Sequence, residues 1–297
     1  MDTVFIVNPK AGQGKNADSL IDEITRNGAQ YYITKAVGDA ELFVRDYCTK
    51  NGTARFIACG GDGTLNEVLN GAAEFNAEIG VLPMGTGNDF CRNFSGNYSD
   101  IKALINAPCQ KIDVIRYTTC GTNRLCANMF NIGFDCNVAD MSASMKQKPF
   151  ISGSLAYFVS ILVMIFRKKG ADLNIEIDGK AVYNGRLLLT SVANGKYCGG
   201  GIMSNPLAEI SDGNINVNII RNIPRWKFIT LLPHYMKGTH MCLKNIEKII
   251  YNKKCKKVKI TPNTPNFRIC VDGEIQNADT VEFEILPQAI DFAVFEK

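Results

Sequence analysis

The sequence predicts an α/β domain with a parallel sheet, followed by a mostly antiparallel β domain. In the first third of the chain, short apolar runs alternate with helical patterns, which is typical of βαβ units. After about residue 112 short β-like runs dominate, and the pairs Asp178-Gly179 and Asp272-Gly273 fit two-residue hairpin turns. A length of 297 residues is enough for two domains of ordinary size.

The alternation can be followed run by run along the first third of the chain. Each apolar run of four or five residues is taken as a strand, and each run with apolar residues three or four apart as a helix. The expected strands are 4–8, 30–34, 55–59 and 79–82, and the expected helices lie at 20–28, 40–47 and 65–73.

The second part of the chain has helical patterns only at 155–166 and around 226–236. We therefore predict an α/β domain over residues 1–117 and a β domain over 118–288. The last strand, at 290–295, could return to either domain, so residues 289–297 are also candidates for the first one. The uncharged segment 150–166 is at the short limit for a transmembrane helix, and we expect a buried or membrane-facing helix there.

Composition excludes several classes of protein. The net charge of +4 is too small to indicate nucleic-acid binding, and none is expected. The 11 cysteines contain no Cys-x-x-Cys pair, so neither a disulfide framework nor a zinc site is expected. The first residues, MDTVFIV, lack a basic segment and a cleavage site, which favours a first strand over a signal peptide.

Three loops rich in glycine, asparagine and threonine follow predicted strands. They are NPKAGQGK (8–15), GGDGTLNEV (60–68) and PMGTGNDF (83–90). Glycines let backbone N–H groups approach a ligand, and a helix N-terminus favours an anion. Because the carboxyl ends of parallel strands share one edge of a sheet, these loops predict a phosphate-binding site there.

Plainer interpretations remain open at each of these positions. Thr64 and Glu67 fit a capping box, so the second loop could be only a well-capped turn. Asp272-Gly273 could equally be a plain hairpin turn, and Asp212-Gly213 another turn. His234 and His240, the only histidines, are poorly spaced for a shared metal site.

The same motifs carry a resemblance to a known family. GGDGTLNEV, PMGTGNDF and NPKAG resemble the catalytic domain of diacylglycerol kinases, including bacterial soluble lipid kinases and sphingosine kinase relatives. NIGFD, NGKYCGGG, PLAEISDGNINV and VDGE follow in the family's order. GGDGT alone is shared with NAD kinases, whereas its combination with PMGTGNDF, SDG and VDGE is similar to the lipid branch. The resemblance implies a Rossmann-like, three-layer, NAD kinase-like domain followed by a β-sandwich.

The resemblance also implies roles for particular residues, with ATP and Mg²⁺ as cofactors. Catalytic roles fall on Asp62, Asp272 and Glu274, the last two as candidates for the general base. A structural magnesium would lie near Asp212, with Glu209 and Asn214 contributing through their backbone carbonyls. The residues implied in ATP binding are Asn8, Pro9, Lys10, Ala11, Gly12, Thr34, Gly60, Gly61, Asp62, Gly63, Thr64, Leu65, Asn66, Glu67 and Thr86.

We therefore expect an ATP- and Mg²⁺-dependent kinase that phosphorylates a lipid hydroxyl, with diacylglycerol converted to phosphatidic acid as the first choice. A sphingoid base, a polyprenol or another glycerolipid remains an alternative acceptor. Further alternatives are a kinase of a soluble substrate, like NAD kinase, and a regulator that binds nucleotide or lipid without catalysis. The resemblance implies a cytoplasmic protein, peripheral at the inner membrane surface, with a homodimer as one assembly.

Two segments bear on membrane contact. Five lysines lie between Lys253 and Lys259, where they could face an anionic bilayer or protect an exposed edge strand. The segment 150–166 is flanked by basic residues and could face acyl chains or belong to the core.

Overall fold

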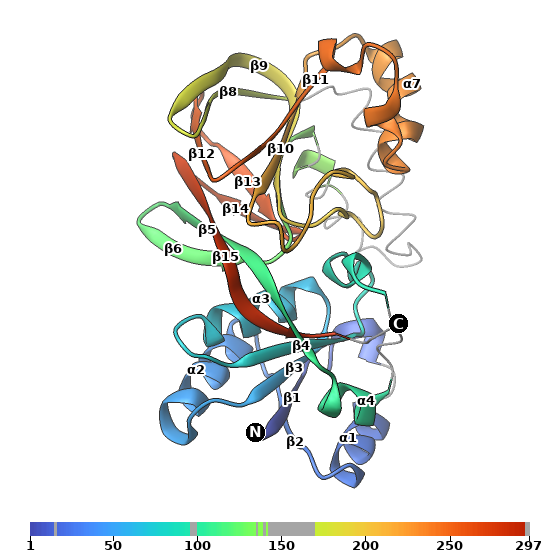
Figure 1. Cartoon of the computed structure of the whole chain (residues 1–297), viewed down its shortest axis with the longest axis vertical. Helices are drawn as coiled ribbons and strands as arrows, with labels where there is room; N and C mark the ends of the chain where they lie inside the picture. Colours follow the sequence, from blue (N-terminus) through green and yellow to red (C-terminus); the bar gives the residue numbers. More distant parts are fainter. Residues whose placement is uncertain (15–16, 96–99, 135, 139–140, 142–169, 295–297) are drawn as a thin grey trace.

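The computed structural model describes residues 1–14, 17–95, 100–134, 136–138, 141 and 170–294, and its two parts lie one above the other in Figure 1. The lower part is an α/β domain built from the N-terminal third of the chain, and the upper part is a β domain. This is the order of fold classes that the sequence predicts. The segment 150–166 and the end of the chain from 295 lie outside the described residues.

The lower part contains four parallel strands in the order β2-β1-β3-β4. Their bounds are Thr3–Val7 (β1), Gln30–Ile33 (β2), Arg55–Gly60 (β3) and Glu78–Pro83 (β4). All four carboxyl ends lie at one edge of the sheet, because the strands are parallel to one another. The four strands expected from the apolar runs are confirmed, with ends that differ by at most one residue.

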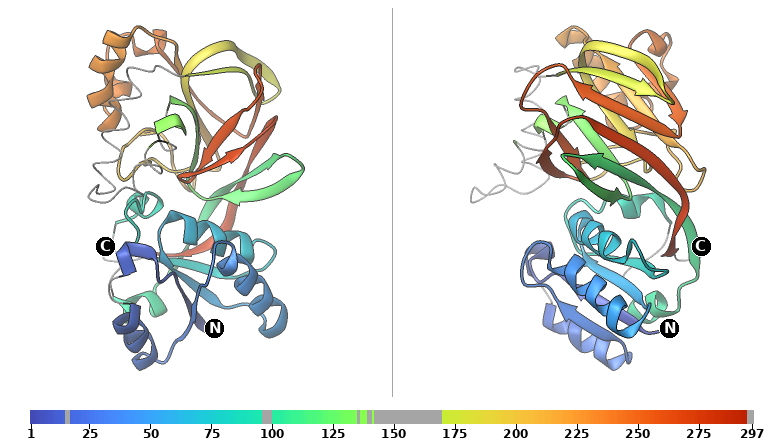
Figure 2. Two further views of the ribbon diagram at one scale, coloured as in Figure 1. Left: turned by 180° about the vertical axis from the view of Figure 1, so that it is seen from behind. Right: turned by 90° about the vertical axis from the view of Figure 1, so that its left-hand side faces the viewer.

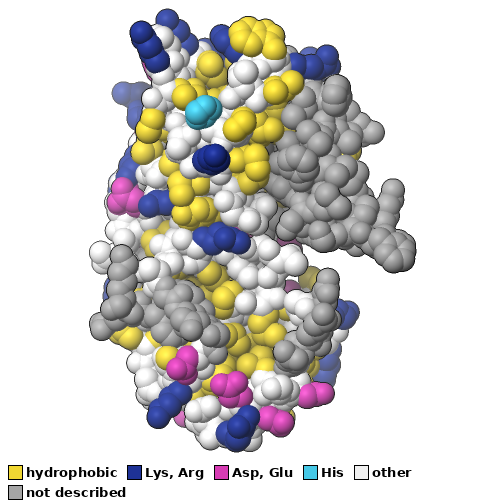
Figure 3. Space-filling view, turned by 90° about the vertical axis from the view of Figure 1, so that its right-hand side faces the viewer, with side chains coloured by type: hydrophobic (Ala, Val, Ile, Leu, Met, Phe, Trp, Pro, Cys, Tyr) yellow, Lys and Arg dark blue, Asp and Glu magenta, His cyan; other side chains and the backbone are white. Residues whose placement is uncertain are grey.

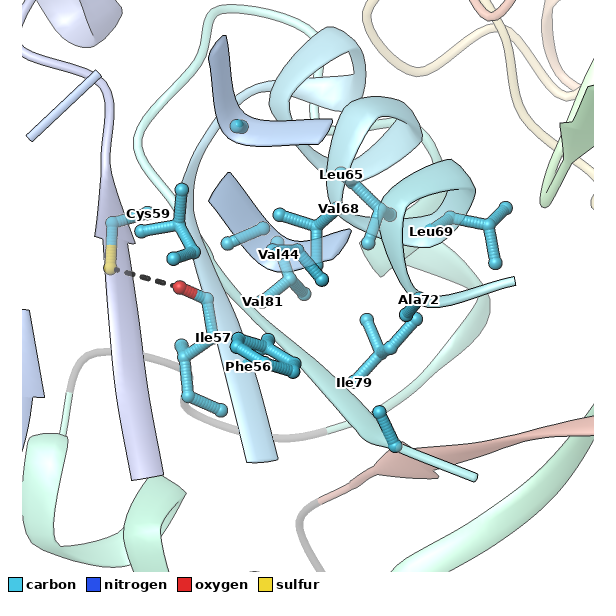
Figure 4. Close-up of a cluster of buried hydrophobic side chains, with 14 of the residues drawn as sticks. Val44, Phe56, Ile57, Cys59, Leu65, Val68, Leu69, Ala72, Ile79 and Val81 are labelled. Carbon is cyan, nitrogen blue, oxygen red and sulfur yellow. Dashed lines mark hydrogen bonds between the residues drawn. The ribbon is translucent and has the colours of Figure 1, made fainter. Parts of the chain in front are cut away.

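Helices cover both faces of these strands, and α2 (Asp39–Asn51) packs beside α3 (Asp62–Ala72). The other helices are α1 (Ala17–Arg26), α4 (Ile101–Asn106) and the short 3₁₀ turns η1 (Ala11–Gly14) and η2 (Phe90–Asn93). Figure 4 shows the α3 side of this core, where Leu65, Val68 and Leu69 meet Phe56 and Ile79 of the sheet. These side chains are at most 3% exposed, so α3 is fixed by packing along its length.

The β domain is mostly antiparallel, as the hairpin signals predict. Its strands include β6 (Thr122–Cys126), β7 (Met129–Gly133), β8 (Ala171–Ile177), β9 (Lys180–Ala193), β10 (Ile215–Arg221), β11 (Ile250–Cys255), β12 (Lys257–Pro262), β13 (Arg268–Val271) and β14 (Glu274–Asn277). Both predicted hairpin turns are present, with positive φ at Asp178, Gly179, Asp272 and Gly273. Positive φ at both central residues is the type I′ geometry.

Two long strands pass from one part of the molecule to the other. They are β5 (Cys109–Thr119) and β15 (Val281–Ala293), which pair antiparallel along most of their length. The lower end of β15 is parallel to β4 through Asp291 and Phe292, and its upper end pairs with β12. Figure 2 shows both strands running from the α/β domain into the β domain. The last strand therefore joins the strands of both parts into one continuous sheet.

One further helix, α7 (Arg225–Met236), lies on the outside of the β domain between β10 and β11. It is followed by two 3₁₀ turns, η3 (His240–Cys242) and η4 (Ile246–Lys248). The helix expected around 226–236 is confirmed. Among the described residues, no helix has the length and apolar character needed to cross a bilayer.

The lysine-rich segment 253–259 spans the end of β11 and the start of β12. Among the described strands β11 pairs only with β10, so Lys253 and Lys254 lie on an edge strand as expected, whereas β12 lies between β8 and β15. Lys254, Lys257 and Lys259 form ion pairs with acidic side chains, and Lys256 donates to the Gly213 carbonyl. These four lysines have partners within the protein, whereas Lys253 forms no ion pair among the described residues.

Candidate active site

Three loops meet above the carboxyl ends of β1, β3 and β4, as the parallel sheet requires. The loop after β1 is fastened to the next strand, because the Asn8 backbone N–H donates to the Cys59 carbonyl at 3.0 Å. The Asn8 side chain donates to Thr64 Oγ1 at 3.2 Å. The loop after β4 is fastened to β3 through the backbone N–H of Met84, 2.8 Å from the Gly60 carbonyl oxygen. The predicted convergence of the three loops is confirmed.

Glycine is required where these loops approach one another. A Cβ at Gly85 would lie 2.6 Å from the Cα of Gly61, and one at Gly12 would lie 2.7 Å from the Met84 carbonyl oxygen. Gly12 also has a φ of 60°, in the left-handed region. The glycines of NPKAG, GGDGT and PMGTG therefore allow contact between the loop backbones themselves.

Helix α3 starts one turn earlier than predicted, and the expected capping box is absent. The N-cap is Gly61 and the helix begins at Asp62, so Thr64 lies inside the first turn. Thr64 accepts the hydrogen bond from Asn8, and the Glu67 carboxylate accepts from the backbone N–H groups of Gly38 and Ala40. Glu67 therefore caps the start of α2. The N-terminus of α3 is left with the partial positive charge of its free N–H groups.

Asp62 and Asp89 are neighbouring carboxylates at this helix terminus. The Asp62 side chain accepts hydrogen bonds from the backbone N–H groups of Asp89 at 3.1 Å and Phe90 at 3.2 Å. Burial raises the pKa of Asp62. Burial, followed by the negative charge of Asp62, raises the pKa of Asp89 to about 6. The nearest cation is Arg92, whose Nε lies 3.7 Å from Asp89 Oδ1.

Asp89 also joins the α/β domain to the β domain. Its carboxylate accepts hydrogen bonds from the backbone N–H groups of Gly200, at 2.9 and 3.0 Å, and Gly201, at 2.8 Å. Both glycines have positive φ, of 85° and 115°, which other residues rarely adopt. The glycine-rich stretch NGKYCGGG thus receives a carboxylate from the opposite domain.

Asp272 enters the site from the β domain through the turn that joins β13 to β14. Its Oδ1 accepts from the Met129 backbone N–H at 2.9 Å, and its Oδ2 from the Cys126 thiol at 3.2 Å. Part of the residue is exposed, but burial of its carboxyl group, reinforced by the charge of Asp62, raises its pKa to about 7. Asp272 is therefore both a residue of a hairpin turn and a candidate site residue, because the tight turn directs its carboxyl group toward Cys126 and Met129.

Glu274 follows two residues later and lies against the first turn of α3. A Cβ at Gly63 would come within 2.7 Å of Glu274 Oε1. Burial, followed by the negative charge of Glu67, raises the pKa of Glu274. The absence of a side chain at residue 63 therefore lets a carboxylate of the β domain reach the N-terminus of α3. Asp62, Asp272 and Glu274, predicted as catalytic residues, come together here from two domains.

Two family models match the chain in succession. The diacylglycerol kinase catalytic domain matches residues 2–117, and the YegS C-terminal NAD kinase beta sandwich-like domain matches residues 128–294. A diacylglycerol kinase of Staphylococcus aureus (strain bovine RF122 / ET3-1) is 30% identical over 97% of this chain and 90% of its own length. The chain belongs to the diacylglycerol kinase catalytic-domain family. It is a lipid kinase of that family.

A further relative agrees with this assignment, and solved structures share the fold. A diacylglycerol kinase of Mycobacterium tuberculosis is 25% identical over 96% of this chain and 92% of its own length. A putative diacylglycerol kinase from Bacillus anthracis shares the fold with a TM-score of 0.75, at 23% identity over 99% of this chain and 97% of its own. An NAD kinase from Archaeoglobus fulgidus superposes with a TM-score of 0.50 at 12% identity, over 99% of this chain and 93% of its own. The NAD kinase-like fold class is thereby confirmed.

The residues predicted to bind ATP in this lipid kinase follow the parallel strands, but several have structural partners of their own. Thr34 follows β2 and donates its backbone N–H to the Val7 carbonyl at 2.9 Å. Asn66 faces the β domain, where its side chain donates to the Leu125 carbonyl at 3.3 Å. Thr86 and Lys10 are exposed at the rim. Their contacts with nucleotide remain predictions.

The residues predicted to hold a structural magnesium have other partners in this lipid kinase. Lys254 Nζ lies 2.6 Å from Asp212 Oδ2 and 3.1 Å from Glu209 Oε1, and Lys256 donates to the Gly213 carbonyl. Asp212 Oδ1 accepts the Asn214 backbone N–H at 2.9 Å. The described residues contain no group of three side chains able to hold a metal ion. The two carboxylates of this loop are thus paired with Lys254, and a magnesium ion held there by backbone carbonyls stays a prediction.

The sequence interpretation missed Asp89, Arg92 and the receiving glycines of the 199–201 loop. Asp89 lies in PMGTGNDF, and NGKYCGGG was recognised as glycine-rich, but nothing in either motif identifies the other as its partner. Only the fold brings residues 89 and 200 together.

Proposed function

We propose that this lipid kinase transfers the γ-phosphoryl group of ATP to the hydroxyl group of diacylglycerol, producing phosphatidic acid. The observation that carries the proposal is the meeting of Asp62, Asp272 and Glu274 at the N-terminus of α3. Family membership supplies the lipid kinase class, and the names of relatives support diacylglycerol as the acceptor.

The nucleotide phosphates would lie on the three glycine loops. The N-terminus of α3 offers free N–H groups and positive charge, which suit a phosphate. The close loop contacts at Gly12, Gly61 and Gly85 leave backbone rather than side chains at this surface. In the loops after β1 and β4, the described cationic side chains are Lys10 and, just beyond the second loop, Arg92.

Magnesium is proposed to arrive with ATP. Mg²⁺ in proteins is usually held by one or two carboxylates together with substrate phosphates. Asp62 and Asp89 supply two adjacent carboxylates whose mutual repulsion contributes to a raised pKa at Asp89, and this donor set fits such an ion. When bound, Mg²⁺ would supply positive charge to the triphosphate.

Asp272 is the proposed proton acceptor. As the acceptor hydroxyl oxygen forms its bond to the γ-phosphorus and the bond from phosphorus to the bridging oxygen breaks, the hydroxyl proton would pass to the Asp272 carboxylate. A base works best when its pKa is near the working pH, and that of Asp272 is about 7. Glu274, against the first turn of α3, would position the acceptor and the base across the domain junction.

The test is phosphorylation of a lipid panel with γ-labelled ATP in mixed micelles, comparing diacylglycerol, a sphingoid base and a polyprenol. We expect product with diacylglycerol, and a loss of kcat of about 100-fold or more for Asp272→Asn. The kcat of the wild type should rise with pH through about 7, because the base must be ionised.

Asp178→Asn is the matched control, because Asp178 begins the other type I′ turn and accepts only backbone N–H groups. Its activity should equal that of the wild type. If only a sphingoid base or a polyprenol were phosphorylated, diacylglycerol would be the wrong acceptor, but the assignment as a lipid kinase would stand. Full activity in both Asp62→Asn and Asp272→Asn would overturn the site.

A further inference from the structure

We infer that the exposed face of α7 is a docking surface for a bilayer that contains anionic lipid. The inference rests on the proposed function in one respect, since a kinase of diacylglycerol must reach its substrate at a membrane. The surface itself is carried by side chains outside the site described above. They lie on α7 and on the segments that flank it, from Arg221 to Lys244.

Helix α7 has one buried side and one apolar exposed side. Phe228, Leu231 and Tyr235 are at most 5% exposed and pack in the core of the β domain. Trp226 and Ile229 are 65% and 52% exposed, which is unusual for such large apolar residues. They lie three residues apart on the helix, and therefore on the same side of it.

The charged residues of the sequence stretch that contains α7 are all basic, up to the exposed Glu247 in η4. The 34 residues from 213 to 246 contain no aspartate or glutamate. They contain five exposed cations, which are Arg221, Arg225, Lys227, Lys237 and Lys244. Within the part of the chain that the structure describes, Lys227, Lys237 and Lys244 form no ion pair. Basic residues beside exposed apolar ones are typical of surfaces that bind anionic membranes.

Figure 3 shows the side of the molecule on which α7 lies. Hydrophobic and basic side chains lie side by side in the upper half of this view, and most of its acidic side chains lie at the lower end. The lysine-rich segment 253–259 does not provide such a surface, because four of its lysines have partners in the protein. Positive charge without acidic neighbours is thus found around α7.

Trp226 has the chemistry of a residue at the membrane interface. Tryptophan combines a large apolar ring with a polar N–H group, and it is enriched where a bilayer meets water. The Lys227 ammonium group lies 5.9 Å from the centre of the Trp226 ring, so the cation can stay in the headgroup layer while the ring enters below. A protein partner would need acidic groups to match these cations, whereas an anionic bilayer supplies negative charge directly.

The end of α7 is connected to the candidate active site by one loop. The backbone N–H of Met203 donates to the Met236 carbonyl at 3.1 Å, and Gly238 packs against the Met203 side chain. The same loop contributes Gly200 and Gly201, whose N–H groups hold Asp89. A bilayer bound at α7 would therefore contact a helix that is itself attached to the loop holding Asp89.

The chain contains a direct reporter of this surface, because Trp226 is its only tryptophan. Tryptophan emission of the wild-type protein would be recorded with phosphatidylglycerol–phosphatidylcholine vesicles and with phosphatidylcholine vesicles alone. We expect a blue shift and quenching by brominated acyl chains with the anionic vesicles, both reduced by high salt. Protein that sediments with vesicles while its emission stays unchanged would overturn the inference.

A variant with Trp226→Ser and Ile229→Ser should lose more than about tenfold in vesicle affinity, because two exposed apolar side chains no longer enter the bilayer. Lys227→Gln should lose about fivefold. The control is Leu42→Ser, since Leu42 is 61% exposed on α2 in the other domain. Equal vesicle binding by the double variant and the wild type would contradict the inference. A wild-type dimer that becomes a monomer in the double variant, without loss of vesicle binding, would assign this face to a second copy of the chain.

The docking surface and the proposed activity can fail separately. The double variant should phosphorylate a short-chain diacylglycerol dissolved as monomers at the wild-type rate, and lose activity only toward vesicles. If the wild type phosphorylated no diacylglycerol but the double variant still lost vesicle binding, the acceptor proposal would fail and the docking surface would stand. Equal loss on monomeric and vesicle substrates would show that α7 acts on the site itself and would overturn the inference.

Discussion

The fold disfavours the ionised form of the Asp272 carboxyl group. Burial raises its pKa from 3.8 to about 7, so its ionised form is disfavoured in the folded protein. The charge of Asp62 adds to that effect. Buried ionised groups that destabilise the fold are typical of functional sites, where their reactivity depends on the raised pKa.

Replacing Asp272 by asparagine should therefore stabilise the protein while abolishing activity. Because the folded state holds the proton more tightly than the unfolded state, the wild type loses stability as pH rises from about 4 to about 7. Asp272→Asn has no such loss and can still accept the Met129 N–H. Urea unfolding at a series of pH values should show a stability gain for the variant that increases up to about pH 7 and then remains constant.

The control for this measurement is Asp178→Asn, in the exposed turn of the other hairpin. This variant measures how much an asparagine side chain in a type I′ turn changes stability when no buried carboxyl group is removed. A gain that is the same at every pH, or the same in both variants, would assign the effect to the turn rather than to the buried carboxyl group.

At the scale of elements, α3 has a different contact on each of its sides. Its first turn faces the loops and Glu274, its core side packs on the sheet, and Asn66 and Asn70 bind the Leu125 backbone of the β domain. Near its end, Gly71 allows contact with α2, since a Cβ there would lie 2.6 Å from the Glu41 carbonyl oxygen. The two glycines of this helix thus serve two different contacts.

This difference predicts opposite consequences for two alanine substitutions. At Gly63 the added Cβ would meet the end of the Glu274 side chain, which can move, so Gly63→Ala should reduce activity and keep stability. At Gly71 it would meet backbone and Val44, which cannot move easily, so Gly71→Ala should lower the melting temperature. Thermal melts and kinase assays on both variants check this. Full activity in Gly63→Ala would mean that the position of Glu274 is unimportant.

Secondary structure could be predicted where one physical signal dominates. Strands β1, β3 and β4 are short apolar runs buried on both faces, and the two Asp-Gly turns need positive φ, so both were read from the sequence. The capping box was wrong because Thr64 and Glu67 have tertiary partners in Asn8 and the start of α2. A local pattern contains no information about such partners.

The long strand β15 illustrates the same limit. The last strand was expected at 290–295, but it forms one strand with the residues from Val281 onward, with an irregularity between Leu286 and Ile290. Gln288 there has a φ of 50°, and the Gln288 N–H donates to Asp113 at 2.8 Å. On either side of residues 286–290 the strand stays paired with β5, but its other partner changes from β12 to β4.

For the whole molecule, β5 and β15 connect two hydrophobic cores. Ile112 and Val114 of β5 belong to the core of the α/β domain, whereas Ile115 and Tyr117 belong to the core of the β domain. Asp113, between them, accepts the backbone N–H groups of Gly213 and Gln288. Neither core can open fully without disturbing a strand that stabilises the other.

We therefore expect the two domains to unfold together. The chain has buried free cysteines in both, including Cys59 in the α/β domain and Cys255 in the β domain. Pulse labelling of thiols along a urea titration, read by mass spectrometry, would give a separate unfolding midpoint for each cysteine.

Leu69→Ala removes part of a buried side chain of the α/β core and should lower the free energy of unfolding by about 2–5 kcal/mol. It should move both midpoints by the same amount. If Cys59 became labelled at lower urea while the Cys255 midpoint stayed in place, the two cores would be independent and the shared strands would act only as a hinge.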